Sequence, residues 1–177
     1  MANPTHVLIA SQTLASSAAS VTFSSIPQTY TDLVLRVSAR TDRSGQQSDG
    51  LIWYYNTTSG SASASYTTLY GSGSAAASSR NNGNFGELAD YTTDGATSTA
   101  NSFGNLELYI PNYTTTGTKP ASAFGVTETN ATTAYMGATA ALFASSIGAV
   151  TSLLIYPGWS TNFVSGSSFY LYGIKNS

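Results

Sequence analysis

Apolar and polar residues alternate with a period of two along most of this chain. In TDLVLRVSAR (31–40), Leu33 and Leu35 fall on one face, and Asp32 and Arg36 fall on the other. Such alternation predicts a half-buried antiparallel β-strand. The same pattern recurs in LIWYYN (51–56), NLELYIP (105–111), TSLLIYP (151–157) and SSFYLYGIK (167–175).

Weaker alternating runs predict further strands between these. They are HVLIAS (6–11), SVTFSSI (20–26), SYTTLYG (65–71), SAFGVTE (122–128) and AYMGATAALF (134–143). The rest of 57–84 is rich in Ser, Gly and Ala and is interpreted as loops. About ten short strands separated by Gly, Pro, Asn and Ser clusters indicate an all-β fold, an antiparallel β-sandwich of jelly-roll type. With 177 residues and no convincing repeat, the chain is expected to form a single domain over 1–177.

Prolines stand at the ends of the predicted strands, where their missing N–H costs no ladder hydrogen bond. Pro111 ends one strand and Pro120 opens the next. The segment between them, NYTTTGTK, is therefore expected to be a hairpin loop. Gly117 is expected to take the left-handed conformation near its tip.

Charge is scarce in this chain. Asp, Glu, Lys and Arg make up 8% of the residues and the formal net charge is −2, whereas ordinary domains carry roughly 25% charged residues. Without a basic surface, a basic amphipathic segment or a long apolar run, neither nucleic acid nor a membrane is an expected partner. There is no cysteine for disulfides or thiolate metal sites. The first residues lack the pattern of a signal peptide, which favours assembly in the cytoplasm.

Few residues offer acid–base or nucleophilic chemistry. The single histidine, His6, lies on an apolar strand, and no motif places a serine and a carboxylate beside it. Glycoside cleavage needs two facing carboxylates, and the candidates Glu87 and Asp94 lie in what looks like a loop. Asp42 and Asp49 are candidate Ca²⁺ ligands, although their spacing matches no Ca²⁺-binding loop. We therefore predict no cofactor, no resident metal and no enzymatic activity.

Surface side chains are the remaining candidates for function. Trp159, in the loop PGWSTNF, is the best candidate for an exposed binding contact, and Tyr113 on the proline-bracketed hairpin is the second. Glu107 faces away from the apolar side of its strand. It is expected to pair with Arg36 or Arg40 across the sheet.

Three segments carry strand and turn signatures that occur together in a known group of proteins. They are IPQTYTDLVLRVSARTD (26–42), SFGNLELYIPNYTTTGTKPASAFGVTETNATTAYM (102–136) and FYLYGIKNS (169–177). In these segments the chain resembles all-β virion proteins of tailed phages, of the cyanophage-like type found in aquatic phages. The resemblance covers most of the chain and is weakest over 57–98.

This resemblance implies one of two roles, both commonly filled by homotrimers. One is a head decoration (cement) protein that binds the major capsid protein, or other virion proteins, on the capsid exterior. The other is a tail-fibre module that binds a receptor or a carbohydrate. A single domain without a visible shaft segment favours the decoration protein. A decoration protein needs a broad flat footprint, whereas a lectin-like site needs exposed aromatics with polar neighbours in one loop cluster.

Overall fold

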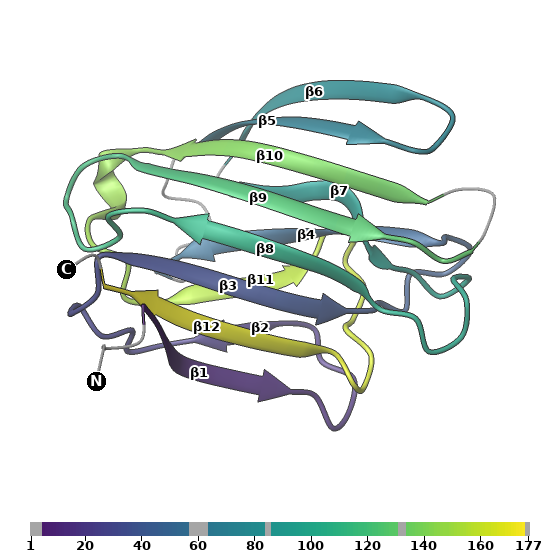
Figure 1. Ribbon diagram of the computed structural model, residues 1–177, viewed down its shortest axis with the longest axis horizontal. Helices are drawn as coiled ribbons and strands as arrows, with labels where there is room; N and C mark the ends of the chain where they lie inside the picture. Colours follow the sequence, from purple (N-terminus) through teal and green to yellow (C-terminus); the bar gives the residue numbers. More distant parts are fainter. Residues whose placement is uncertain (1–4, 57–63, 84–85, 131–133, 176–177) are drawn as a thin grey trace.

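The structure, a computed structural model, is a sandwich of two antiparallel sheets (Figure 1). It describes residues 5–56, 64–83, 86–130 and 134–175, with the backbone alone at 87–90 and 145. In spatial order, the large sheet contains β1 (His6–Thr13), β12 (Ser168–Ile174), β3 (Asp32–Ala39), β8 (Gly104–Ile110), β9 (Lys119–Thr127), β10 (Tyr135–Phe143), β5 (Ala64–Gly71) and β6 (Ala76–Gly83). The small sheet contains β2 (Val21–Phe23), β11 (Leu153–Pro157), β4 (Ser48–Tyr55) and β7 (Gly86–Asp94). A 3₁₀ turn, η1 (Ser145–Ile147), precedes β11.

The all-β, antiparallel sandwich predicted from the alternation is confirmed, while the jelly-roll connectivity stays a prediction. Register shows why the alternation was informative. Leu35 of β3 lies opposite Leu108 of β8 on one side and Leu171 of β12 on the other. All three side chains are fully buried. Because side chains of paired residues project to the same face, the apolar positions of neighbouring strands form rows directed into the sandwich.

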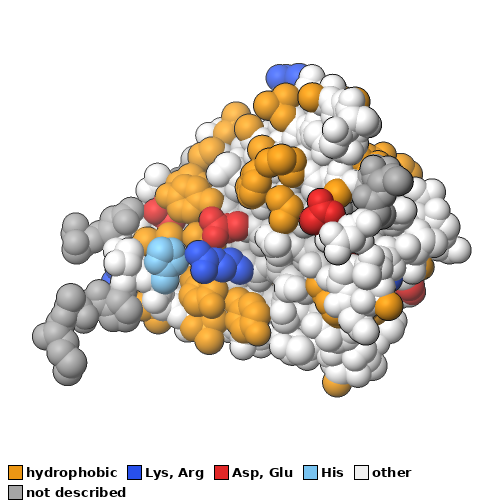
Figure 2. Space-filling model, turned by 45° about the vertical axis from the view of Figure 1, so that its right-hand side comes forward, with side chains coloured by type: hydrophobic (Ala, Val, Ile, Leu, Met, Phe, Trp, Pro, Cys, Tyr) orange, Lys and Arg blue, Asp and Glu red, His pale blue; other side chains and the backbone are white. Residues whose placement is uncertain are grey.

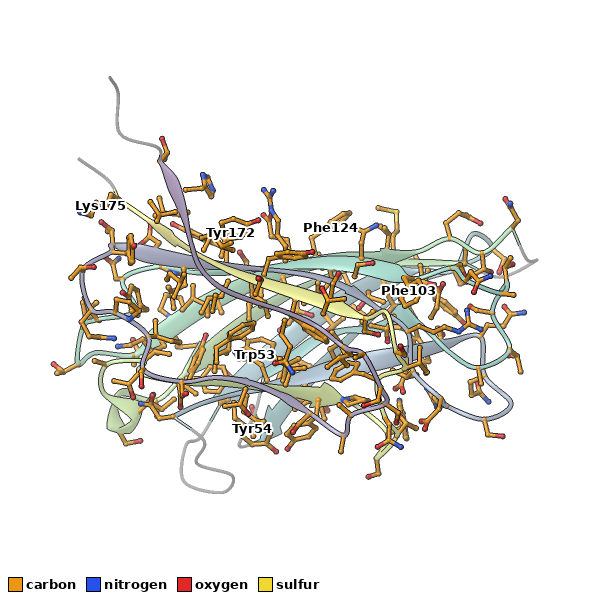
Figure 3. The ribbon with its side chains drawn as sticks, turned by 90° about the horizontal axis from the view of Figure 1, so that it is seen from below. Trp53, Tyr54, Phe103, Phe124, Tyr172 and Lys175 are labelled. Carbon is orange, nitrogen blue, oxygen red and sulfur yellow. The ribbon has the colours of Figure 1, made fainter. Side chains whose placement is uncertain are left out.

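Aromatic residues fill much of the space between the sheets. Trp53 and Tyr55 project inward from β4, and each packs against Phe143 of β10, with ring centroids 5.7 and 4.5 Å apart respectively. Tyr54, between them in sequence, faces the other way and stacks on Tyr156 of β11. Figure 3 shows Trp53 between the two layers and Tyr54 on the outer side of the small sheet. The opposition of Trp53 and Tyr55 to Tyr54 follows from the strand period of two.

The sequence pattern missed two strands, β6 and β7. Residues 76–83 are Ala, Ser, Arg, Asn and Gly, which have low strand propensity, and β6 forms by pairing along the whole of β5. In β7, Thr92, Thr93 and Asp94 are buried although they are polar. The strand begins at Gly86, where an added Cβ would overlap the ring of Trp53. Close approach to β4, rather than an apolar pattern, therefore defines this strand.

The proline-bracketed hairpin forms, but it is held differently from the expectation. The left-handed residue is Asn112, with φ of 47°, and Gly117 does not have a positive φ. Lys119 is buried, and its Nζ donates to the carbonyls of Thr115 and, at 2.9 Å, Gly117. Burial lowers the pKa of this ammonium group. The loop is thus closed by its own lysine, which replaces a glycine turn as the organising feature.

Candidate functional site

Trp159 lies in the loop that follows β11, at the end of the sandwich opposite the chain termini. The loops that join β3 to β4, β7 to β8 and β11 to β12 gather at this end (Figure 1). Trp159 is 54% exposed, as the sequence predicted. Its ring is covered on one side by Arg43, whose guanidinium carbon lies 4.4 Å from the ring centroid. This is a cation–π contact, which holds the exposed ring in place.

The buried carboxylate of Asp49 contacts the loops of both Arg43 and Trp159. Its Oδ2 accepts hydrogen bonds from the hydroxyls of Thr161 (2.7 Å) and Thr41 (2.9 Å). Its Oδ1 accepts one from the backbone N–H of Gly50 (2.8 Å) and lies 4.0 Å from Nη1 of Arg43. Burial raises the pKa of Asp49, and the hydrogen bonds and Arg43 oppose that effect. The carboxylate therefore links the loop of Arg43 to the loop of Trp159.

Asp42 faces solvent beside this network. Its Oδ1 accepts from the backbone N–H of Asn162 (2.7 Å) and its Oδ2 from the side-chain amide of the same residue (2.9 Å). These bonds lower the pKa of Asp42. Asp42 and Asp49 thus have separate partners, and the described residues contain no group of three or more His, Asp or Glu side chains placed to hold a metal. The Ca²⁺ site considered from the sequence gains no support from this geometry.

Arg40 organises the neighbouring loop between β7 and β8. Its Nη1 donates to the carbonyl of Thr99 (2.7 Å) and its Nη2 to the carbonyls of Ser98 (3.0 Å) and Ala96 (3.2 Å). Nη1 also donates to the carbonyl of Ser102 at 3.1 Å. The fork of donors in one guanidinium can satisfy several carbonyls at once, so this arginine has a structural role.

Tyr113 is not an exposed contact, and that expectation from the sequence is wrong. Its side chain is fully buried, and its hydroxyl donates to the carbonyl of Pro27. The backbone of Val150 donates to the Tyr113 carbonyl at 2.8 Å. At the start of the same hairpin, the backbone N–H of Asn112 donates to Asp32 Oδ1 at 2.8 Å. The base of the hairpin is therefore anchored to the sandwich instead of projecting from it.

The residues weighed for catalysis are dispersed or engaged in structure. His6 lies on β1, with its ring edge-on to Tyr172 at 6.5 Å. Asp94, at the end of β7, is buried and accepts a hydrogen bond from the Thr127 hydroxyl. The side chain of Glu87 lies outside the described residues, and so does its proposed pairing with Asp94.

The outer face of the large sheet is a second candidate site, and sequence reasoning missed it. We call this surface the apolar face, and it is defined by Leu8, Leu69, Phe124, Met136, Leu142 and Tyr170, all of them exposed. Figure 3 shows Phe124 projecting outward from the sheet, and Figure 2 shows hydrophobic patches on this side of the molecule with few charged groups among them. The predicted ion pair is confirmed near its centre, where Arg36 Nε donates to Glu107 Oε2 at 3.0 Å.

A signal for this face is present in the sequence. In β9 and β10 both sides of the alternation carry apolar residues, because Phe124 and Met136 fall on the face opposite Ala121 and Phe143. A strand that is apolar on both faces is typically covered on both. Among the described residues, the small sheet covers the inner face and no strand covers the outer one.

Comparison with known proteins identifies no relative. No family model, curated protein or solved structure matches this chain. Within the described residues, no helix has the length and apolar character needed to span a membrane. Function must therefore be inferred from the loops around Trp159 and from the apolar face.

Proposed function

We propose that this chain is a non-enzymatic structural protein of a phage virion. It acts as a capsid decoration (cement) protein that binds the major capsid protein on the outside of the head shell, as a homotrimer. The sequence resemblance supports the kind of particle and partner. The proposed mode of binding rests on one observation, the apolar face of the large sheet.

The apolar face has the composition of an interface. Leu69, Phe124, Met136 and Leu142 lie on the adjacent strands β5, β9 and β10 and are between 46% and 60% exposed. Soluble monomers rarely leave large contiguous apolar patches open to water, and such patches mark contact sites. Leu69, Phe124, Met136 and Ala138 line a shallow groove in this surface.

The face is also broad and nearly neutral. Arg36 and Glu107 satisfy each other, and the guanidinium of Arg36 lies 5.9 Å from the Tyr172 ring centroid. A sheet surface with exposed apolar residues and a compensated ion pair can be buried against another protein without leaving an unpaired charge. Burial of this face across neighbouring capsid subunits would stabilise the shell, because binding to the assembled state favours that state.

The first experiment is a count of this chain per purified particle, relative to the major capsid protein. Decoration of the lattice requires the two chains to be present in comparable numbers. A copy number far below that of the capsid protein would place the chain on the tail, and the decoration proposal would be dropped.

A binding experiment tests the face itself. Phe124→Ser and Met136→Ser are expected to abolish binding to shells that lack this protein, while circular dichroism stays unchanged because both side chains are exposed. Trp159→Ala, on a different surface, is the matched control and should bind normally. Undiminished binding by both face variants would contradict the proposed footprint.

A further inference from the structure

Trp159 stands apart from the other exposed hydrophobic residues. Of the large hydrophobic side chains exposed in the described part of the chain, six lie on the apolar face and the seventh is Trp159. Its loop lies at the end opposite the termini, the polar residues 160–162 follow it in the chain, and Arg43 of the polar loop 42–47 contacts its ring. The decoration proposal does not use this residue.

The indole is held in place by Arg43, which in turn contacts the buried residue Asp49. Arg43 covers one side of the ring, and its Nη1 donates to the carbonyl of Ser48 at 3.2 Å. The same guanidinium lies beside the buried carboxylate of Asp49, which also holds Thr161, two residues after Trp159. With Arg43 over one side of the ring, Trp159 remains 54% exposed. Such a preorganised ring loses little freedom when a ligand binds.

Polar groups with remaining hydrogen-bond capacity lie in the same loops. The exposed carboxylate of Asp42 accepts one bond at each oxygen from Asn162. Each carboxylate oxygen can accept a second bond. An aspartate is already ionised at neutral pH, and the bonds from Asn162 lower the pKa of Asp42 further. Ser160, next to Trp159, has a φ of 55° and is exposed, so the loop turns sharply at the aromatic ring.

This chemistry distinguishes between classes of ligand. A protein partner needs an apolar centre of several residues, and Trp159 has no exposed large hydrophobic neighbour on its loops. A nucleic acid needs cations for its phosphates, and the guanidinium of Arg43 is already engaged by the indole, a carbonyl and Asp49. A pyranose ring needs one flat aromatic surface for its C–H face and hydrogen-bonding groups for the hydroxyls around its edge.

We propose that Trp159, together with Asp42 and Asn162, forms a binding site for a neutral saccharide. The pyranose stacks on the open side of the indole, and its hydroxyls donate to the Asp42 carboxylate. Arg43 and Asp49 are positioning residues that hold the ring. The site goes beyond the decoration role and does not depend on it, since it lies outside the apolar face.

The two tryptophans make this site directly measurable. Trp53 is fully buried and Trp159 is exposed, so a collisional quencher such as iodide reports selectively on Trp159. The full-length protein is titrated with neutral oligosaccharides of glucose, galactose, mannose and N-acetylglucosamine. At least one should protect Trp159 from quenching in a saturable manner, at micromolar to millimolar concentrations. A panel without any saturable protection would overturn the proposal.

Variants test whether the saccharide binds at Trp159. Isothermal titration calorimetry measures affinity for the variants that lack the Trp159 fluorescence. Trp159→Ala should weaken saccharide affinity at least about tenfold, Asp42→Ala should weaken it, and Trp159→Phe should weaken it less than Trp159→Ala. Phe124→Ser is the matched control and should bind the saccharide normally, so that failure of this proposal is separable from failure of the decoration role. Binding that survives Trp159→Ala, or protection by single-stranded DNA in place of saccharides, would contradict the assignment.

Discussion

The hydroxyl of Thr161 donates a 2.7 Å hydrogen bond to the buried carboxylate of Asp49. The two residues are far apart in the sequence, and their bond fastens the loop after β11 to the start of β4. Asp49 also lies beside Arg43, whose guanidinium covers Trp159. One buried carboxylate therefore fixes both loops that present the exposed indole.

Asp49→Asn is expected to change how stability depends on pH. Folding raises the pKa of Asp49 above its ordinary 3.8, so in the window above 3.8 the native state binds more protons than the unfolded state. The contribution of Asp49 to the free energy of unfolding therefore falls as pH rises through that window, by at most about 1.4 kcal/mol per pH unit. In urea titrations between about pH 3 and 7, the difference between wild type and D49N should decline with rising pH.

Asp42→Asn provides a control of opposite sign. Hydrogen bonds from Asn162 lower the pKa of Asp42 below 3.8, so its contribution is present above that value and is lost as pH falls through the folded pKa. The difference between wild type and D42N should therefore shrink on acidification. A wild-type minus D49N difference that rises with pH would show that the environment of Asp49 is misassigned.

Arg40→Lys is expected to loosen the loop between β7 and β8. An ammonium group cannot reach the spread of carbonyls, from Ala96 to Ser102, that the planar guanidinium contacts. We expect a loss of about 1–3 kcal/mol in the free energy of unfolding and faster hydrogen exchange at 95–103. Arg36→Lys, in an exposed ion pair, should cost less than about 1 kcal/mol. Unchanged exchange in R40K would count against this role.

Two variants of Tyr113 measure separately what its hydrogen bond and its packing contribute to stability. Tyr113→Phe removes only the hydroxyl that donates to Pro27, at a cost of about 0.5–1.5 kcal/mol. Tyr113→Ala also empties a fully buried site and should cost about 3–5 kcal/mol, as other large aromatic truncations do. Tyr170→Ala, on an exposed ring, should change stability by no more than about 0.5 kcal/mol. Chemical denaturation measures all three, and an equally mild Tyr113→Ala would restore Tyr113 as a surface contact.

Two glycines, one on β12 and one in the hairpin between β8 and β9, form a matched pair. A Cβ at Gly173 would overlap the ring of Tyr30, whereas a Cβ at Gly117 would have no heavy atom within 4 Å. Gly173→Ala should therefore lower the unfolding free energy by about 1–3 kcal/mol or more. Gly117→Ala should be neutral or stabilising by up to about 1 kcal/mol, since its φ is not positive. Equal thermal unfolding midpoints for the two variants would refute this packing.

The candidate residues show where sequence reasoning succeeds and where it stops. Glu107 was expected opposite Arg36 or Arg40, and pairing between β3 and β8 selects Arg36. Trp159 was expected to be exposed because it follows a strand in a polar loop, and it is. Tyr113 has an equally polar surrounding sequence but is buried, because the hairpin folds back onto a distant segment that contains Pro27. Local composition does not encode that long-range contact.

The sequence by itself determined the class of fold and the faces of its principal strands. Period-two alternation is a local property, since side chains on a strand project to opposite sides whatever lies next to them. Only the tertiary structure decided that 76–83 and 86–94 become strands, because each depends on a partner strand to complete its hydrogen bonds. The same is true of both proposed sites. The apolar face requires five strands, β1, β12, β9, β10 and β5, to belong to one sheet. The support of Trp159 requires two distant loops to meet at Asp49.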